Sequence, residues 1–88
     1  MKIGFTPTGW DDYLYWQARD SKMLARVNAL IQDTQRSPFK GIGKPEPLRE
    51  SWKGWWSRRI DDEHRLVYRC TGKGDDQQLE IAQCRYHY

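Results

Sequence analysis

The segment from Ser37 to Pro47 constrains the fold of this 88-residue chain more than any other stretch. Its eleven residues include three prolines and two glycines. Proline removes a backbone donor and glycine loosens the backbone, so a helix cannot continue through the segment. The chain is therefore divided into two parts that must form regular structure separately. We expect the segment itself to be an ordered loop with a functional role.

The part before this loop is predicted to form a short strand at residues 2–5 and then two helices. Thr8 is the expected N-cap of the first helix, with Asp11 as a variant of the capping box. The side chains expected on one side of that helix are Trp10, Tyr13, Leu14 and Gln17. Asp20 or Ser21 is expected to cap the second helix. Its apolar stripe, at i, i+3, i+4 and i+7 spacing, contains Met23, Leu24, Val27, Leu30, Ile31 and Thr34. The two helices should form a hairpin.

The part after the loop contains three β-rich runs, at residues 55–61, 64–71 and 79–86, whose short connections predict antiparallel pairing. Alternate side chains of a strand face opposite sides of a sheet. The even positions, expected to face the helices, are Ile60, Leu66, Tyr68, Cys70, Ala82, Cys84 and Tyr86. The odd, polar positions are Arg59, Arg65, Arg69, Gln83, Arg85 and His87, and the exceptions are Arg58, Val67, Leu79 and Ile81. Trp56 is expected in the core, and Trp55 is left open between core and surface.

These patterns predict an α+β fold in which an N-terminal helical hairpin packs on an antiparallel β-sheet. A chain of this length supports one modest core, so residues 1–88 are expected to be a single domain. No apolar run approaches the ~18 residues of a membrane span, and the N-terminus lacks the apolar stretch of a signal peptide. We therefore expect a cytoplasmic protein, with Cys70 and Cys84 as reduced, buried thiols.

Positive charge is concentrated between Arg36 and Arg59, where seven cations face two acids, a net of +5. Such a cluster favours a polyanion as partner. A metal site is poorly supported, because His64 and His87 have no metal-binding spacing and the cysteines fall on the core face. The run from Gly41 to Lys44 lacks the length of a P-loop and its Ser or Thr, which excludes nucleotide hydrolysis of that type. No cofactor is predicted.

Metal-free cleavage of RNA remains, in which the 2′-OH attacks the neighbouring phosphate. This reaction uses a base, cations for the developing charge and an acid for the leaving 5′ oxygen. Glu46 lies between two prolines in the basic loop, Arg59 and Arg65 lie on the polar sheet face, and His87 ends that face. Residue types alone leave other roles open. Glu46 could be a local ion-pair partner, the arginines could bind phosphate passively, and His87 could belong to a frayed chain end.

Five segments, taken together and in order, resemble the YoeB toxins of the RelE superfamily. They are Trp10–Gln17, Gly43–Leu48, Trp56–Ile60, Glu63–Tyr68 and Cys84–Tyr88. The resemblance implies a RelE-like, microbial-RNase-like fold. It also implies a toxin of a type II toxin-antitoxin system, a ribosome-dependent endoribonuclease that cuts mRNA in the ribosomal A site. A non-catalytic module that binds RNA or the ribosome is the alternative function.

Site residues follow from the same resemblance, position by position. Glu46 matches the general base, Arg65 the phosphate-stabilising arginine, His87 the general acid, and Tyr88 the terminal tyrosine that shapes the site. Lys44 and Arg59 match basic residues of the cleft, and Arg49 stands where many members have lysine.

The resemblance further implies a YefM-type antitoxin, operator DNA bound through that antitoxin, and a possible toxin homodimer. Residues 72–78 and 50–53 depart from the family pattern, and both are expected to lie away from the proton-transfer groups.

Overall fold

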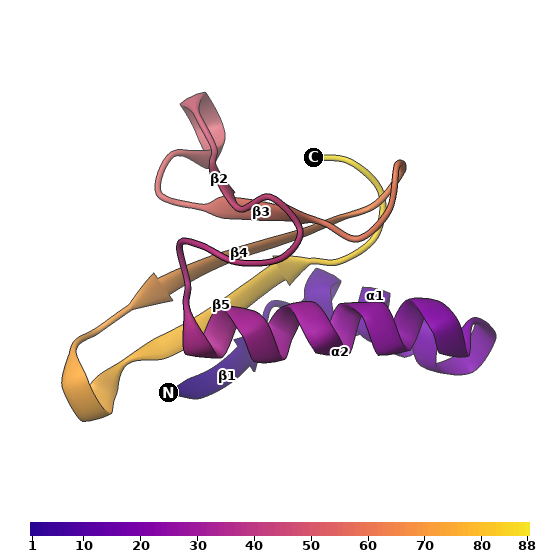
Figure 1. Cartoon of the computed structure of the whole chain (residues 1–88), viewed down its shortest axis with the longest axis horizontal. Coiled ribbons are helices and arrows are strands. Elements are labelled where there is room, and N and C mark those ends of the chain that lie inside the picture. The colour runs from indigo at the N-terminus through magenta and orange to yellow at the C-terminus, as the bar shows by residue number, and fades with distance from the viewer.

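Two helices lie on one face of a five-stranded sheet in the computed structural model, which describes residues 1–88 (Figure 1). The elements are β1 (Lys2–Phe5), α1 (Pro7–Arg19), α2 (Ser21–Arg36), β2 (Glu46–Pro47), β3 (Trp56–Arg59), β4 (Arg65–Thr71) and β5 (Gln78–Gln83). Short 3-10 turns occupy Glu50–Trp52 and Gly74–Asp76. The predicted α+β architecture is confirmed. Neither helix is long and apolar enough to cross a membrane.

The strand order is β1-β5-β4-β3-β2, and one of the four pairings is parallel. The pairs β3–β4 and β4–β5 are antiparallel, as their short connections predict. Residues Glu46–Pro47, expected to belong to the loop, form β2 and pair antiparallel with β3. In contrast, β1 pairs parallel to β5, with Lys2 opposite Gln78. The sheet is therefore mixed rather than wholly antiparallel.

Both helices begin at side-chain caps. The cap of α1 is Thr6, whose hydroxyl oxygen accepts a hydrogen bond from Gly9 N–H at 3.0 Å, and the prediction of Thr8 was wrong. Pro7 explains the difference, since proline is favoured at the first helical position. Asp20 caps α2 by accepting from Met23 N–H at 3.1 Å, as expected. Gly9 allows α1 to approach β5 closely, because a Cβ there would lie 2.5 Å from the Ile81 carbonyl oxygen.

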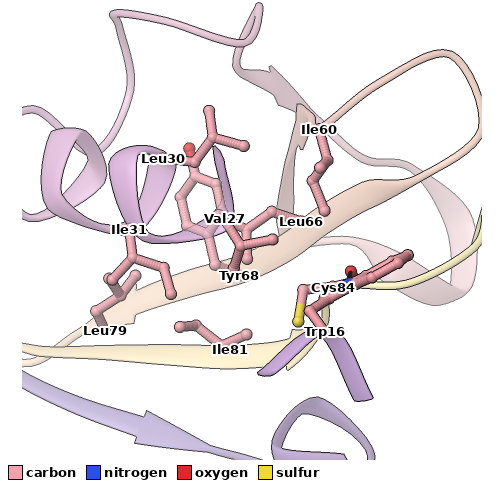
Figure 2. Packing of buried hydrophobic residues seen from close by; sticks show 10 residues of the cluster. All are labelled: Trp16, Val27, Leu30, Ile31, Ile60, Leu66, Tyr68, Leu79, Ile81 and Cys84. Carbon is pink, nitrogen blue, oxygen red and sulfur yellow. Dashed lines mark hydrogen bonds between the residues drawn. The ribbon is translucent and has the colours of Figure 1, made fainter. Parts of the chain in front are cut away.

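The core lies between the helices and the sheet (Figure 2). Val27, Leu30, Ile31 and Thr34 of the predicted stripe are buried on α2. The main cluster consists of Trp16, Val27, Leu30, Ile31, Ile60, Leu66, Tyr68, Leu79, Ile81 and Cys84. Burial raises the pKa of the Cys84 thiol to about 12, and Asp12 adds to that rise, so the thiol stays protonated. Cys70 is only half-buried, and both cysteines are free thiols.

A bulge changes the alternation of side chains along β5. Val67 lies opposite Gln83 but Tyr68 lies opposite Ile81, so Ala82 has no partner on β4. An unpaired residue of this kind reverses the alternation of side chains on one side of it relative to the other side. Leu79 and Ile81 consequently face the helices. Ala82 is buried on the opposite face with Val67 and Leu48, so the expectation that it faces the helices was wrong.

The face of the sheet away from the helices is only partly cationic. Its small apolar cluster of Leu48, Val67 and Ala82 is extended by Trp52 and Trp55. The guanidinium of Arg69 lies 4.5 Å from the Trp55 ring centre and its Nε donates to Glu80 at 2.7 Å. Trp55 thus belongs to this second cluster. Trp56 packs against the main core, as expected.

Arg58 attaches the loop between α2 and β2 to the sheet. Its side chain is 0% exposed, and all five guanidinium N–H groups have acceptors. The acceptors are Asp33 Oδ2, the carbonyl oxygens of Ser37, Lys40 and Ile42, and the Tyr68 hydroxyl, at 2.6–3.2 Å. Sequence reasoning counted Arg58 among the cations offered to a polyanion, and that was wrong because Asp33 neutralises it inside the fold.

Asp33 completes this network. Besides Arg58, Ile42 N–H donates to its Oδ2 at 3.0 Å and Arg36 Nη2 donates to its Oδ1 at 3.3 Å. The hydrogen bond from Arg58, together with that from Ile42, lowers the pKa of the Asp33 carboxyl. A carboxyl whose pKa is lowered by folding stabilises the fold fully above its ordinary range. That contribution is lost as the pH falls through the lowered value.

Replacing Arg58 by alanine should destabilise the protein severely. Removing one partner of a buried ion pair typically costs about 3–5 kcal/mol. Asp33 would keep only its pair with Arg36, and three loop carbonyl oxygens would lose their donor. For a domain of this size, each kcal/mol lowers the melting temperature by about 4–8 °C, so the loss should exceed about 12 °C. Arg59→Ala is the matched control, since Arg59 is the next residue of β3 and is exposed. Thermal unfolding followed by circular dichroism measures both. Equal melting temperatures for the two variants would show that the Arg58 network contributes no stability.

Candidate active site

Six of the seven predicted site residues line one pocket of about 200 Å³. The pocket is formed by Lys44, Glu46, Ser57, Arg59, Arg65, His87 and Tyr88. They come from the loop, from β2, β3 and β4, and from the C-terminal residues, which return to the side of β2 and β3 (Figure 1). Arg49 is the exception. It lines a neighbouring depression of about 500 Å³ that shares Glu46 and Tyr88 with the pocket.

Glu46 enters the pocket from the two-residue strand β2 and lies between Pro45 and Pro47. It pairs with Ser57 of β3, and it takes part in no ion pair. The preceding turn is fixed by Gly43, whose φ is 80° and whose carbonyl oxygen accepts from Arg59 N–H at 2.7 Å. A Cβ on Gly43 would lie 2.7 Å from Leu30 Cδ2. The loop therefore holds an uncompensated carboxylate beside the arginines of the sheet.

Two arginines face each other across neighbouring strands, with Arg59 of β3 opposite Arg65 of β4. Like charges in this position destabilise a sheet. No carboxylate forms an ion pair with either one. Arg65 is nevertheless buried, and its Nη1 donates to the carbonyl oxygens of Asp61 at 2.7 Å and His64 at 2.9 Å. Two guanidinium groups without carboxylate partners, one of them held by backbone carbonyl oxygens, are suited to binding an anion.

The C-terminal residues reach the pocket by a turn, not by a continued strand. β5 ends at Gln83, and Tyr86 has a φ of 65° and is 52% exposed. The predicted strand to Tyr86, with its ring in the core, was therefore wrong. The turn is anchored through Cys84, whose N–H donates to Asp12 Oδ2 at 3.1 Å and whose carbonyl oxygen accepts from Trp16 Nε1 at 2.8 Å. Burial raises the pKa of Asp12.

Sequence reasoning missed Ser57 and the contacts of His64. Ser57 precedes Arg58 by one residue, so its odd position on β3 places it on the side of Arg59, and parity could have identified it. His64 was considered only as a metal ligand. Its Nδ1 accepts from Tyr86 N–H at 2.7 Å, a contact that no spacing rule predicts.

The comparison with protein families matches residues 5–88 to the family described as the YoeB-like toxin of bacterial type II toxin-antitoxin systems. The chain belongs to this family. Among curated YoeB-like toxins, Toxin YoeB of Streptomyces coelicolor is 57% identical over 88 residues, and that of Escherichia coli K12 is 54% identical. Both matches cover 100% of this chain and 100% of the relative.

Solved structures agree with the YoeB-like assignment. A YoeB/ParE toxin from Agrobacterium tumefaciens superimposes with a TM-score of 0.97 at 52% identity, over 100% of both chains. The toxin in a heterotetrameric YoeB-YefM complex from Staphylococcus aureus has a TM-score of 0.86 at 44% identity, over 100% of this chain and 98% of that one. A YoeB dimer from the same organism has a TM-score of 0.85 at 44% identity, with the same coverage.

The two segments expected to depart from the YoeB pattern lie in different places. Residues 72–78 connect β4 to β5 and line neither the pocket nor the depression. In contrast, Glu50, Ser51 and Trp52 line the depression that shares Glu46 and Tyr88 with the pocket. The expectation that this second segment lies away from the proton-transfer groups was wrong.

Proposed function

We propose that this YoeB-like toxin is a ribosome-dependent endoribonuclease that cleaves mRNA in the A site by acid-base catalysis. The observation that carries the proposal is the gathering of Glu46, Arg65 and His87 around one pocket whose cations have no carboxylate partner. These groups are the base, the anion-binding donor and the acid that 2′-OH attack requires. The largest pocket of the protein, about 570 Å³ between β1 and the helices, has no carboxylate, imidazole or cation among its lining residues.

In this mechanism Glu46 takes the proton of the 2′-OH, and the oxygen attacks the adjacent phosphorus. Negative charge then develops on the non-bridging oxygens and is stabilised by Arg65, Arg59 and Lys44. His87 donates its proton to the 5′ oxygen as the P–O bond breaks. The products carry a 2′,3′-cyclic phosphate and a free 5′ hydroxyl.

Mapping mRNA ends after incubation with programmed ribosomes tests the proposal. We expect new ends within the A-site codon, and none on the same mRNA without ribosomes. A protein that occupies the A site without producing ends would be the non-catalytic RNA- or ribosome-binding module. Equal cleavage of naked RNA would identify a free ribonuclease, and products with a 5′ phosphate would exclude attack by the 2′-OH.

Partners of the relatives suggest partners for this chain. We infer a YefM-type antitoxin and a possible homodimer, because the Staphylococcus aureus relatives are a YoeB-YefM complex and a YoeB dimer. The unpaired cations of the pocket rim suit an acidic segment of such an antitoxin. Operator DNA would be bound only through the antitoxin. A ribosomal substrate places the protein in the cytoplasm.

Ribosome binding should weaken steeply with salt. Four cations line the pocket and its neighbouring depression without an ion-pair partner: Lys44, Arg49, Arg59 and Arg65. Each phosphate contact to a single strand contributes about −0.7 to the slope of log K against log salt, so four give about −2.8. Binding titrations between low and physiological salt measure this slope. A slope near zero would show that contacts between these cations and phosphates do not hold the protein on the ribosome.

A further inference from the structure

The turn that carries His87 to the pocket is held at one residue by two hydrogen bonds. Tyr86 N–H donates to His64 Nδ1 at 2.7 Å, and the Tyr86 carbonyl oxygen accepts from Arg65 N–H at 3.1 Å. Tyr86 adopts a positive φ of 65°, which is uncommon for a bulky residue. Such a conformation persists only where the surroundings impose it. The two contacts therefore help to fix the backbone conformation of Tyr86, and with it the direction of the chain toward His87.

His64 is itself rigidly placed. It is only 8% exposed, and its ring packs edge-to-face on Trp16 with centres 4.9 Å apart. Its backbone N–H donates to Asp61 Oδ1 at 2.8 Å. Because a backbone N–H can only donate, Nδ1 must be the unprotonated nitrogen of the ring. The side chain thus presents a fixed acceptor to the residue that precedes His87.

We propose that His64 is a positioning residue for the reaction, which holds His87 at the leaving 5′ oxygen through its contact with Tyr86. The inference rests on the proposed ribonuclease function. His64 does not line the pocket, so it acts on the substrate only through the turn. Its loss should therefore affect the proton donation by His87 and spare the steps that depend on Glu46 and Arg65.

The matched variants are His64→Leu and His64→Asn, two side chains of nearly equal size. Asparagine keeps an oxygen acceptor close to the place of Nδ1, whereas leucine removes it. Displacement of a catalytic group by about 1 Å can reduce a rate about 10²-fold. We expect a loss of that order in single-turnover cleavage on programmed ribosomes for His64→Leu, with most of the activity recovered in His64→Asn.

A modified substrate separates loss of the acid from general damage. In a 5′-bridging phosphorothiolate, sulfur replaces the oxygen that leaves, and a thiol ionises at a pH near about 8.5, so it needs no proton donor. On this substrate the defect of His64→Leu should largely disappear, as should that of His87→Gln. Arg65→Ala should remain slow on both substrates, because the phosphorane charge still forms.

Three outcomes would overturn the positioning role while the wild-type protein cleaves: a wild-type rate for His64→Leu, an equal defect for His64→Asn, or a defect that the sulfur substrate leaves unchanged. If His64→Leu does not fold, hydrogen exchange of the wild-type protein decides. The Tyr86 amide should be protected to the extent of the Arg65 amide, and an unprotected Tyr86 amide would refute the contact. A wild-type protein that makes no ends refutes the ribonuclease function instead.

Discussion

Removal of His87 and Tyr88 should slow cleavage severely and leave the fold nearly unchanged. The two residues make none of the hydrogen bonds that anchor the turn, which end at Tyr86. Without an acid the 5′ oxygen leaves as an unprotonated alkoxide, which slows the step by about 10² to 10⁴. A single-turnover time course on programmed ribosomes measures the loss, and circular dichroism melting reports the fold.

His87→Gln is the cleaner form of this experiment. Truncation moves the terminal carboxylate onto Tyr86, whose carbonyl oxygen accepts from Arg65 N–H, and a new negative charge there would weaken the anion site. Glutamine removes the proton donor without moving the chain end, so it should reproduce most of the defect. Full activity in His87→Gln would remove His87 as the acid.

Glu46→Gln should lose about 10² to 10⁴ in cleavage rate, the contribution typical of a positioned general base. Binding should not weaken, because the change removes a negative charge from a pocket that contains Lys44, Arg59 and Arg65. Single-turnover cleavage and ribosome binding are measured on the same preparation.

Glu50→Gln is the matched control, since it neutralises a second carboxylate that lines the neighbouring depression only. It should cleave at the wild-type rate. Near wild-type cleavage by Glu46→Gln would require another base, and Glu63, in the turn before β4, would be tested next.

Sequence patterns correctly predicted those elements that are determined by residues close together in the chain. The stripe from Val27 to Thr34 specifies how α2 packs, and the short turns specify the antiparallel hairpins. The parallel pairing of β1 with β5 joins residues more than seventy positions apart, and no local signal reports such a contact. Ala82 was misplaced because a bulge depends on both strands, and parity considers only one.

The sequence pattern of charge was the least reliable predictor of which cations are free to bind a polyanion. Arg58 and Arg59 are adjacent and chemically identical, yet one is a buried structural cation and the other lines the pocket. Only the facing Asp33 and the loop carbonyls distinguish them, and these lie far along the chain. The roles predicted for Glu46, Arg65 and His87 came from the family resemblance. Spacing alone could not bring residues from the loop, the sheet and the chain end to one pocket.

The anchoring of Cys84 by Asp12 and Trp16 links catalysis to the cooperativity of folding. The basic strands β3 and β4 form a hairpin from neighbouring residues, so closing it costs little chain entropy. The turn toward His87 depends on α1, which contacts Cys84 across 68 to 72 residues of sequence. Long-range contacts of this kind form late because closing a long loop costs entropy. Weakening the contacts of α1 with Cys84 should therefore release the chain end that carries His87 while the hairpin that carries Arg59 and Arg65 stays paired.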